Sequence, residues 1–355
     1  MTIAVQINSS SSNSNFFGDF NYAYFSLLST LHKDFKIIFI SDQPFDPCIF
    51  IEPNIELVTL SPQIRNSISA RIWYTIKLKK ILKKNKIDFF FSNSSFCNLK
   101  QWSKQIIFIA DDTFLKKKSM EKYIHASSFI VTSNEYIQTK LSERFPALIN
   151  KLLFIPPFIS NNIKPINYSQ KQEVKNMFSD GVDYFLFYAI HTTTANIIMT
   201  LKAFSIFKKW QLSNMKLLIV IGEKQNKKLS VEIENYKFRS DVKFYHENNT
   251  DVLCSAAYAS VFLPDGLKTE NKMLDVMKMN IPILLPEHDY YQSFFKESAL
   301  YFLNNESALS QKMMLVYKDE STRSSIINSA QLITSALNPN TVVEKIINTI
   351  IKPKV

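Results

Sequence analysis

Short apolar runs alternate with longer segments of helical periodicity along almost the whole chain. The runs are rich in β-branched and aromatic residues, and each is the length of one buried strand. They predict strands at 3–7, 36–41, 55–60, 89–91, 105–109, 129–132, 152–155, 184–188, 216–221, 242–245, 260–263 and 282–285. The periodic segments predict helices at 15–32, 67–84, 121–125, 134–144, 196–210, 250–258, 270–279, 307–318, 321–337 and 341–351.

This alternation predicts an α/β protein with two doubly wound, Rossmann-like domains, because strand–helix–strand units build parallel sheets covered on both faces. Two domains also fit the length of 355 residues. The pattern is interrupted at Pro156-Pro157 and the polar stretch 160–170, which we interpret as the linker. We therefore expect domains at 1–157 and 158–337, with 338–355 a helix packing back on the first. Ligands of such sheets bind beyond the carboxyl ends of the strands, so we expect a cleft between the domains to hold the site.

Glycine is scarce, and this excludes the common phosphate-binding loops. The chain has four glycines, at Gly18, Gly181, Gly222 and Gly266. Neither the G-x-G-x-x-G spacing nor the G-x-x-x-x-G-K-[ST] spacing occurs among them. The histidines show no metal-ligand spacing, so we expect no metal site.

The remaining composition bears on the compartment. Cys48, Cys97 and Cys254 are scattered, which predicts neither a disulfide framework nor a metal site. No stretch reaches the roughly 20 apolar residues of a membrane helix, and the amino-terminal residues lack the pattern of a signal peptide. We expect a cytoplasmic protein, peripheral at the inner face of the membrane if it binds there.

The charge is positive, with 42 Lys and Arg against 31 Asp and Glu, a formal +11. Only five of the basic residues are arginines, so we expect no nucleic-acid partner, because base recognition relies on bidentate arginine. The densest basic stretch interleaves lysines with apolar residues, namely Lys77, Lys79, Lys80, Lys83, Lys84 and Lys86 with Ile76, Leu78, Ile81 and Leu82. It fits an anionic membrane surface or another polyanion, with contacts through Lys77, Lys80, Lys83 and Lys84. It equally fits a solvated helix end whose apolar residues form a core-facing stripe.

Several segments, in order and at matching spacing, resemble the retaining, metal-independent family 4 of the GT-B glycosyltransferases. The segments of the second half are 188–196 with 201–204, 215–222, 263–264 and 274–283, and those of the first half are 106–111, 128–133 and 152–157. The resemblance implies two Rossmann-like domains of the GT-B kind. It also implies a nucleotide-diphosphate sugar held against the second domain, with an oxocarbenium-like transition state and a diphosphate leaving group neutralised by basic side chains and helix N-termini.

The resemblance also assigns site residues. Asp275 takes the place of the second of two glutamates eight residues apart and implies a ligand of the ribose hydroxyls. Leu267 stands at the first place, and Glu270 is the nearest carboxylate for the sugar. Thr192–Ala195 replace the family's basic pair, so His191, Lys224 and Lys268 remain as ligands of the diphosphate. The other donor-side positions are Gly222, Gly266 and Asn196, for which the cap of a helix is the alternative. Asp111 and Asp112 follow a strand of the first domain and would face the acceptor; an Asx turn is the alternative.

Two functions follow from the resemblance. The first is a hexosyltransferase that moves a sugar from a UDP- or GDP-sugar to a glycan or lipid-linked acceptor, with retention and without a metal or a permanently bound cofactor. The second is a catalytically inactive GT-B protein that binds a glycan, a nucleotide or a partner protein, because glycines and charged residues are missing where the chemistry of the family uses them.

Overall fold

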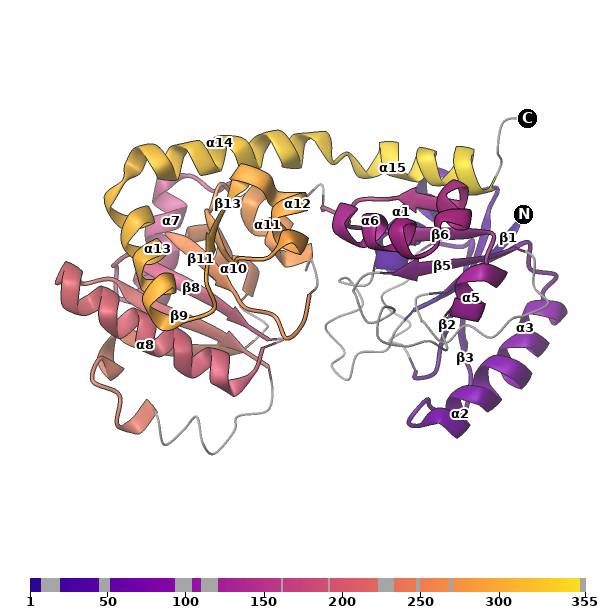
Figure 1. The fold of residues 1–355 in the computed structure, drawn as a ribbon, viewed down its shortest axis with the longest axis horizontal. Helices are drawn as coiled ribbons and strands as arrows, with labels where there is room; N and C mark the ends of the chain where they lie inside the picture. Colours follow the sequence, from indigo (N-terminus) through magenta and orange to yellow (C-terminus); the bar gives the residue numbers. More distant parts are fainter. Residues whose placement is uncertain are drawn as a thin grey trace. The chain divides into compact units, whose positions relative to one another are not determined.

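The computed structural model describes residues 1–7, 20–44, 52–92, 104–109, 121–160, 162–190, 192–222, 233–246, 250–267 and 271–351. The chain forms two compact units. The first comprises Met1–Phe158 together with Leu337–Val355, and the second comprises Ile159–Ala336. Each unit has its own parallel sheet with its own helices (Figure 1).

In the described part of the first unit, seven parallel strands form one sheet in the order β3-β2-β1-β4-β5-β6-β7. The strands are β1 (Thr2–Gln6), β2 (Lys36–Ser41), β3 (Ile55–Thr59), β4 (Phe89–Ser92), β5 (Gln105–Ile109), β6 (Phe129–Thr132) and β7 (Leu152–Phe154). In β2 every residue after Lys36 is buried, as expected for a parallel strand covered on both faces.

The helices of this unit come from both ends of the chain. They are α1 (Phe20–Leu31), α2 (Ser67–Ile72), α3 (Lys79–Lys84), α5 (Glu121–Ala126), α6 (Glu135–Arg144) and α15 (Pro339–Ile346), with π-helical segments at Trp73–Leu78 and Ile347–Ile351 and a 3₁₀ segment at Pro146–Lys151. Val343 and Ile346 of α15 are buried in the same hydrophobic core as Ile3 and Phe39 of the central strands. The last helix of the chain therefore belongs to the first unit.

One continuous helical stretch runs through α2, the π-helical segment and α3. Its N-terminus is capped by Asn66, whose side chain accepts hydrogen bonds from two backbone N–H groups. Its buried side chains are Trp73, Tyr74, Leu78 and Leu82. Three isoleucines of the stretch point to solvent, with exposed fractions of 70% for Ile68, 37% for Ile72 and 59% for Ile76. The assignment of Ile76 to a core-facing stripe is therefore wrong, because the opposite side of the helix carries the indole and the leucines.

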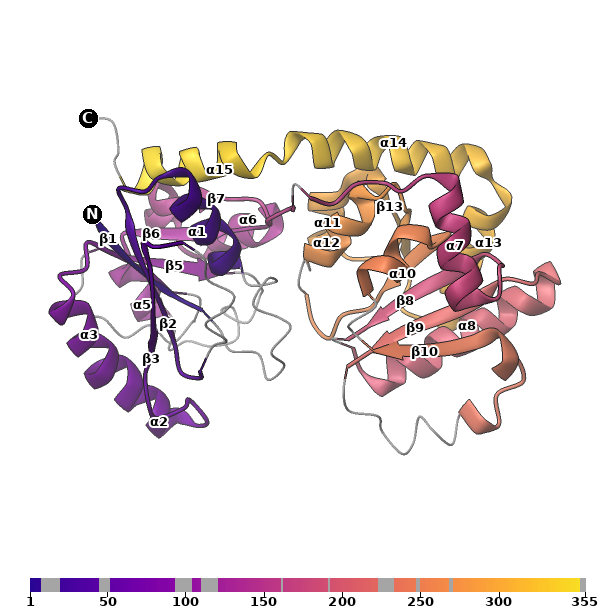
Figure 2. The ribbon, with the colours of Figure 1, turned by 180° about the vertical axis from the view of Figure 1, so that it is seen from behind.

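In the described part of the second unit, six parallel strands follow the order β10-β9-β8-β11-β12-β13, and Figure 2 shows β8, β9 and β10 side by side. The strands are β8 (Tyr184–Ala189), β9 (Lys216–Ile221), β10 (Val242–His246), β11 (Ala259–Phe262), β12 (Ile283–Pro286) and β13 (Ala299–Phe302). The helices are α7 (Tyr168–Ser179), α8 (Thr194–Gln211), α10 (Thr250–Ala256), α11 (Asn271–Lys278), α12 (Asp289–Phe295), α13 (Glu306–Lys318) and α14 (Glu320–Ala336).

The two doubly wound parallel sheets confirm the predicted fold class. In each sheet the first strand of the unit lies inside, and the chain leaves it in both directions. The order therefore reverses between β8 and β11 in the second unit and between β1 and β4 in the first. At such a switch point the loops beyond the carboxyl ends diverge and leave room for a ligand.

Among the described residues, the α-helices α7 and α12 and the strand β13 were not predicted. The first overlaps the end of the stretch 160–170 that we interpreted as linker, so that interpretation is wrong for its last three residues. A capping box at Asn167 and Gln170, with each side chain bonded to the other's backbone N–H, starts the helix there.

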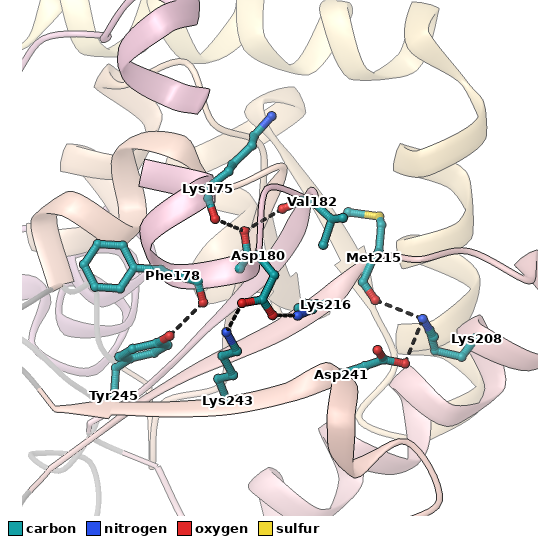
Figure 3. A network of polar contacts seen from close by, with 11 residues as sticks. Lys175, Phe178, Asp180, Val182, Lys208, Met215, Lys216, Asp241, Lys243 and Tyr245 are labelled. Atoms are coloured by element: carbon teal, nitrogen blue, oxygen red, sulfur yellow. Dashed lines mark hydrogen bonds and ion pairs between the residues drawn. The ribbon is translucent and has the colours of Figure 1, made fainter. Parts of the chain in front are cut away.

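A polar network ties α7 to the amino ends of β9 and β10 (Figure 3). Asp180 ends the helix in a left-handed conformation with φ of 56°, and its carboxylate pairs with Lys216 and, at 3.0 Å, with Lys243. Beside it the nearly buried Lys208 pairs with Asp241 at 3.0 Å and donates to two backbone carbonyls. Because parallel strands share one direction, this charged network lies at the sheet edge opposite the carboxyl ends. It stabilises the fold at the edge of the sheet that lies away from the carboxyl ends of the strands.

Candidate functional site

The predicted site residues divide into two groups. Asp275, Asn196, Gly222, Gly266 and Leu267 are described by the structure. The others lie outside the described residues, namely Asp111, Asp112, His191, Lys224, Lys268 and Glu270.

The loop after β8 is bonded to the loop after β11, across the switch point of the second unit. The amide of Asn196 donates to the hydroxyl of Thr192 at 3.1 Å and to the carbonyl of Leu263 at 3.4 Å. The Thr192 hydroxyl also donates to that carbonyl. The first turn of α8 is thus anchored directly to the end of the neighbouring strand, which gives this edge a defined geometry.

Thr193, and not Asn196, caps α8. Its hydroxyl accepts the backbone N–H of Asn196 at 3.2 Å, so the helix begins at Thr194 and Asn196 lies in its first turn. The cap alternative for Asn196 is therefore wrong. The helix is 18 residues long, and its N-terminus lies at the switch-point edge, where the macrodipole favours an anion.

Asp275 lies in the middle of α11 with little exposure. Its carboxylate is 3.2 Å from the ammonium of Lys272, and their side chains are 14% and 19% exposed. Burial raises the pKa of the Asp275 carboxyl, and the Lys272 ammonium offsets part of this rise. Asp275 is therefore a desolvated carboxylate whose charge is stabilised mainly by Lys272 and to a smaller extent by Lys278.

Lys272 joins two helices. Besides Asp275 it pairs with Asp251 in the first turn of α10, whose side chain is 66% exposed. Burial alone would lower the pKa of Lys272, but Asp275 and Asp251 hold it above its usual range. Sequence reasoning missed both Lys272 and Asp251. The i, i+3 spacing of Lys272 and Asp275 was a readable signal, since such residues are neighbours on a helix surface.

Gly222 and Gly266, the two described glycines at this edge, differ in whether their backbone conformation requires a glycine. Gly266 has φ of +85°, a conformation that side chains with a Cβ rarely adopt, and its carbonyl lies 3.5 Å from the hydroxyl of the buried Tyr291. A Cβ on Gly222, just after β9, would meet only one backbone oxygen at 3.9 Å, which is ordinary contact. Leu267 next to Gly266 is partly exposed and offers no ionisable group for a sugar.

The first unit has a buried polar chain at its own switch point. The amide of Gln6 at the end of β1 donates to the Tyr74 hydroxyl at 2.6 Å, and the Ser92 hydroxyl at the end of β4 donates to the Gln6 oxygen at 3.1 Å. All three side chains are buried. This network orders the carboxyl ends of β1 and β4.

Two absences hold for the described residues only. In that part of the chain no three His, Cys, Asp or Glu side chains gather in a way that could hold a metal ion. Over the same residues, no helix combines the length and the apolar character needed to cross a membrane.

No protein-family model and no curated protein matches this sequence. Solved structures match it over nearly its whole length. A glycosyltransferase from Rickettsia africae has 13% identity and a TM-score of 0.74, over 99% of each chain. WaaG, a glycosyltransferase of lipopolysaccharide biosynthesis, has the same identity and TM-score over 98% of this chain and 99% of its own. HepE of Anabaena, solved with UDP-glucose, gives the same values. The chain therefore has the two-domain GT-B fold of these glycosyltransferases.

Proposed function

We propose that the protein is a glycosyltransferase that moves a hexose from a nucleotide-diphosphate sugar to a glycan or lipid-linked acceptor, with retention and without a metal. The main support is the fold, which matches glycosyltransferases over 98–99% of both chains. One of these glycosyltransferases was solved with UDP-glucose. Asp275, a carboxylate of α11 with little exposure, supports the same proposal.

In this proposal the donor lies along the carboxyl edge of the second sheet. Asp275 accepts hydrogen bonds from the ribose hydroxyls, as an ionised carboxylate does best. The diphosphate lies at the N-terminus of α8, near Asn196, where the helix dipole and His191, Lys224 and Lys268 balance its charge. The backbone at Gly222, Gly266 and Leu267 borders the donor.

The sugar and the acceptor complete the proposed site. Glu270 holds the transferred hexose, and Asp111 and Asp112 meet the acceptor on the first unit. Positive charge at the leaving diphosphate, rather than a metal, stabilises the transition state.

One observation favours an inactive, ligand-binding protein as the second candidate. Asp275 is already paired with Lys272, and Thr192–Ala195 supply no cation to a diphosphate. A protein that keeps the fold and the nucleotide contact but not the catalysis fits these substitutions as well.

Calorimetry separates the two candidates. We would titrate UDP, GDP and their glucose and mannose conjugates to ~1 mM, which detects affinities of about −4 kcal/mol and stronger. Asp275→Asn should lose nucleotide binding, while Glu320→Gln, a control in another i, i+3 ion pair of 3.2 Å, should retain it. Release of sugar from the donor, absent in Asp275→Asn, supports the enzyme, and binding without turnover supports the second candidate. No nucleotide binding by the unmodified protein contradicts both.

A further inference from the structure

The helical stretch 67–84 presents an apolar row to solvent. Ile68, Ile72 and Ile76 are spaced four residues apart and are all exposed, two of them by more than half. Ile68 and Ile72 belong to α2 and Ile76 to the π-helical turn Trp73–Leu78, and residues four apart stay close to one side in both kinds of helix. The isoleucines therefore form a ridge on the side of the helix away from its buried side chains.

Basic side chains surround this ridge. From residue 65 to residue 86 the sequence contains eight basic residues and no acidic residue, namely Arg65, Arg71, Lys77, Lys79, Lys80, Lys83, Lys84 and Lys86. All of them except Lys79 are exposed. Among the described residues, no carboxylate pairs with Lys77, Lys80, Lys83 or Lys84. A segment of 22 residues thus carries +8 in a chain whose net charge is +11.

We propose that this basic isoleucine face, residues 65–86, docks on an anionic lipid bilayer. The isoleucines enter the boundary between headgroups and acyl chains, and the lysines and arginines lie at the level of the anionic headgroups. The helix lies in the plane of the interface, because its other side is held in the core by Trp73 and Leu82. The proposal concerns a surface of the first unit and does not rest on the proposed transferase activity.

The isoleucines distinguish a bilayer from a soluble polyanion. A nucleic acid or an acidic polysaccharide is bound by the cations alone, and exposed isoleucine adds nothing to phosphate contacts. An apolar ridge gains only where it leaves water, as it does below the headgroups. Charge and apolar exposure on one helix face therefore favour the lipid surface.

Vesicle flotation tests the proposal with the full chain. Vesicles of phosphatidylcholine alone are compared with vesicles containing ~30% phosphatidylglycerol. Changing Lys77, Lys80, Lys83 and Lys84 to Gln should lower the partition coefficient on anionic vesicles on the order of 1000-fold. Changing Ile68, Ile72 and Ile76 to Ser should lower it about 10-fold or more. High salt should weaken binding of the unmodified protein.

Matched variants separate the face from the overall charge and hydrophobicity. The charge control changes four exposed lysines of the second unit to Gln, at Lys164, Lys202, Lys209 and Lys318. The apolar control changes the exposed Ile149, Met177 and Leu332 to Ser. Both controls should float like the unmodified protein. The proposal is overturned if the unmodified protein does not float, or if the face variants and the control variants lose binding equally. It is also overturned if the protein binds heparin but not vesicles.

Discussion

The ion pair between Lys272 and Asp275 in α11 leads to a stability prediction. Lys272→Met removes the ammonium but keeps most of the aliphatic side chain. Asp275 then stays in a site where its side chain is 14% exposed, without the cation that lies 3.2 Å away. The partner Asp251 is largely exposed and loses little.

Coulomb's law sets the scale of the loss. Two unit charges at 3.2 Å attract by about 1–5 kcal/mol for effective dielectric constants between about 80 and 20. Removing one partner of a fully buried pair costs about 3–5 kcal/mol. Since both side chains keep some contact with water, we expect a loss of about 2–3 kcal/mol in the free energy of unfolding. For a unit of this size that lowers Tm by about 4–12 °C.

The loss should depend on pH in one direction. The folded pKa of Asp275 is raised, so its ionised form destabilises the folded state above that pKa, and this penalty disappears as the carboxyl is protonated. The difference in Tm between Lys272→Met and the unmodified protein should be largest at neutral pH and shrink toward about pH 4, near the ordinary aspartate pKa. Differential scanning calorimetry between these pH values measures it.

Lys140→Met is the matched control, because Lys140 and Glu143 form an exposed i, i+3 pair of 3.0 Å with side chains 37% and 57% exposed. It should change stability by less than about 1 kcal/mol. Equal losses in the two variants, or a loss in Lys272→Met that does not shrink on acidification, would refute the assignment of the penalty to a desolvated Asp275.

Four other variants or probes test the packing. Lys208→Met should lower the free energy of unfolding in urea by about 2–4 kcal/mol, since Asp241 loses its partner and two carbonyls lose a buried donor. Trp73→Ala should cost about 3–5 kcal/mol in the same assay, because the indole is fully buried. Gly266→Ala should cost about 1–2 kcal/mol by the strain of a positive φ, although a Cβ meets no atom there, and a thermal melt measures it. Cys254, buried and with its pKa raised to about 12 by burial, should react with iodoacetamide only on unfolding, as read by peptide mass spectrometry.

Most of the fold was predictable because parallel strands covered on both faces are continuous apolar runs. The strands at 36–41 and 216–221 have the bounds that the pattern predicts. The strand Ala299–Phe302 and the short helix Asp289–Phe295 were missed, because an apolar run of a few residues does not distinguish strand from helix. The place of the strand is set by its pairing with β12, a tertiary contact.

The candidate site was less predictable than the fold. The position of Asp275 followed from a resemblance, but its ion pair depends on the rotamer of Lys272 and on the approach of α10. Asn196 and Thr193 are both residue types that cap helices. Only the path of the chain after β8 decides which of the two side chains reaches the free backbone N–H groups of the first turn. Such choices are made by tertiary contacts, which a single sequence does not specify.

The stretch 67–84 shows why periodicity predicts a helix more surely than it predicts which side of the helix is buried. Two apolar sets share this stretch, one containing Trp73 and one containing Ile72, and both repeat at helical spacing. The indole N–H of Trp73 donates to the carbonyl of Leu60 at 2.9 Å, a contact that only the folded chain can provide. A tryptophan buries more surface than an isoleucine and needs a partner for its N–H, so the side that satisfies both enters the core. The isoleucines then remain in water among exposed lysines and arginines, and any gain from burying them must come from a surface outside the chain.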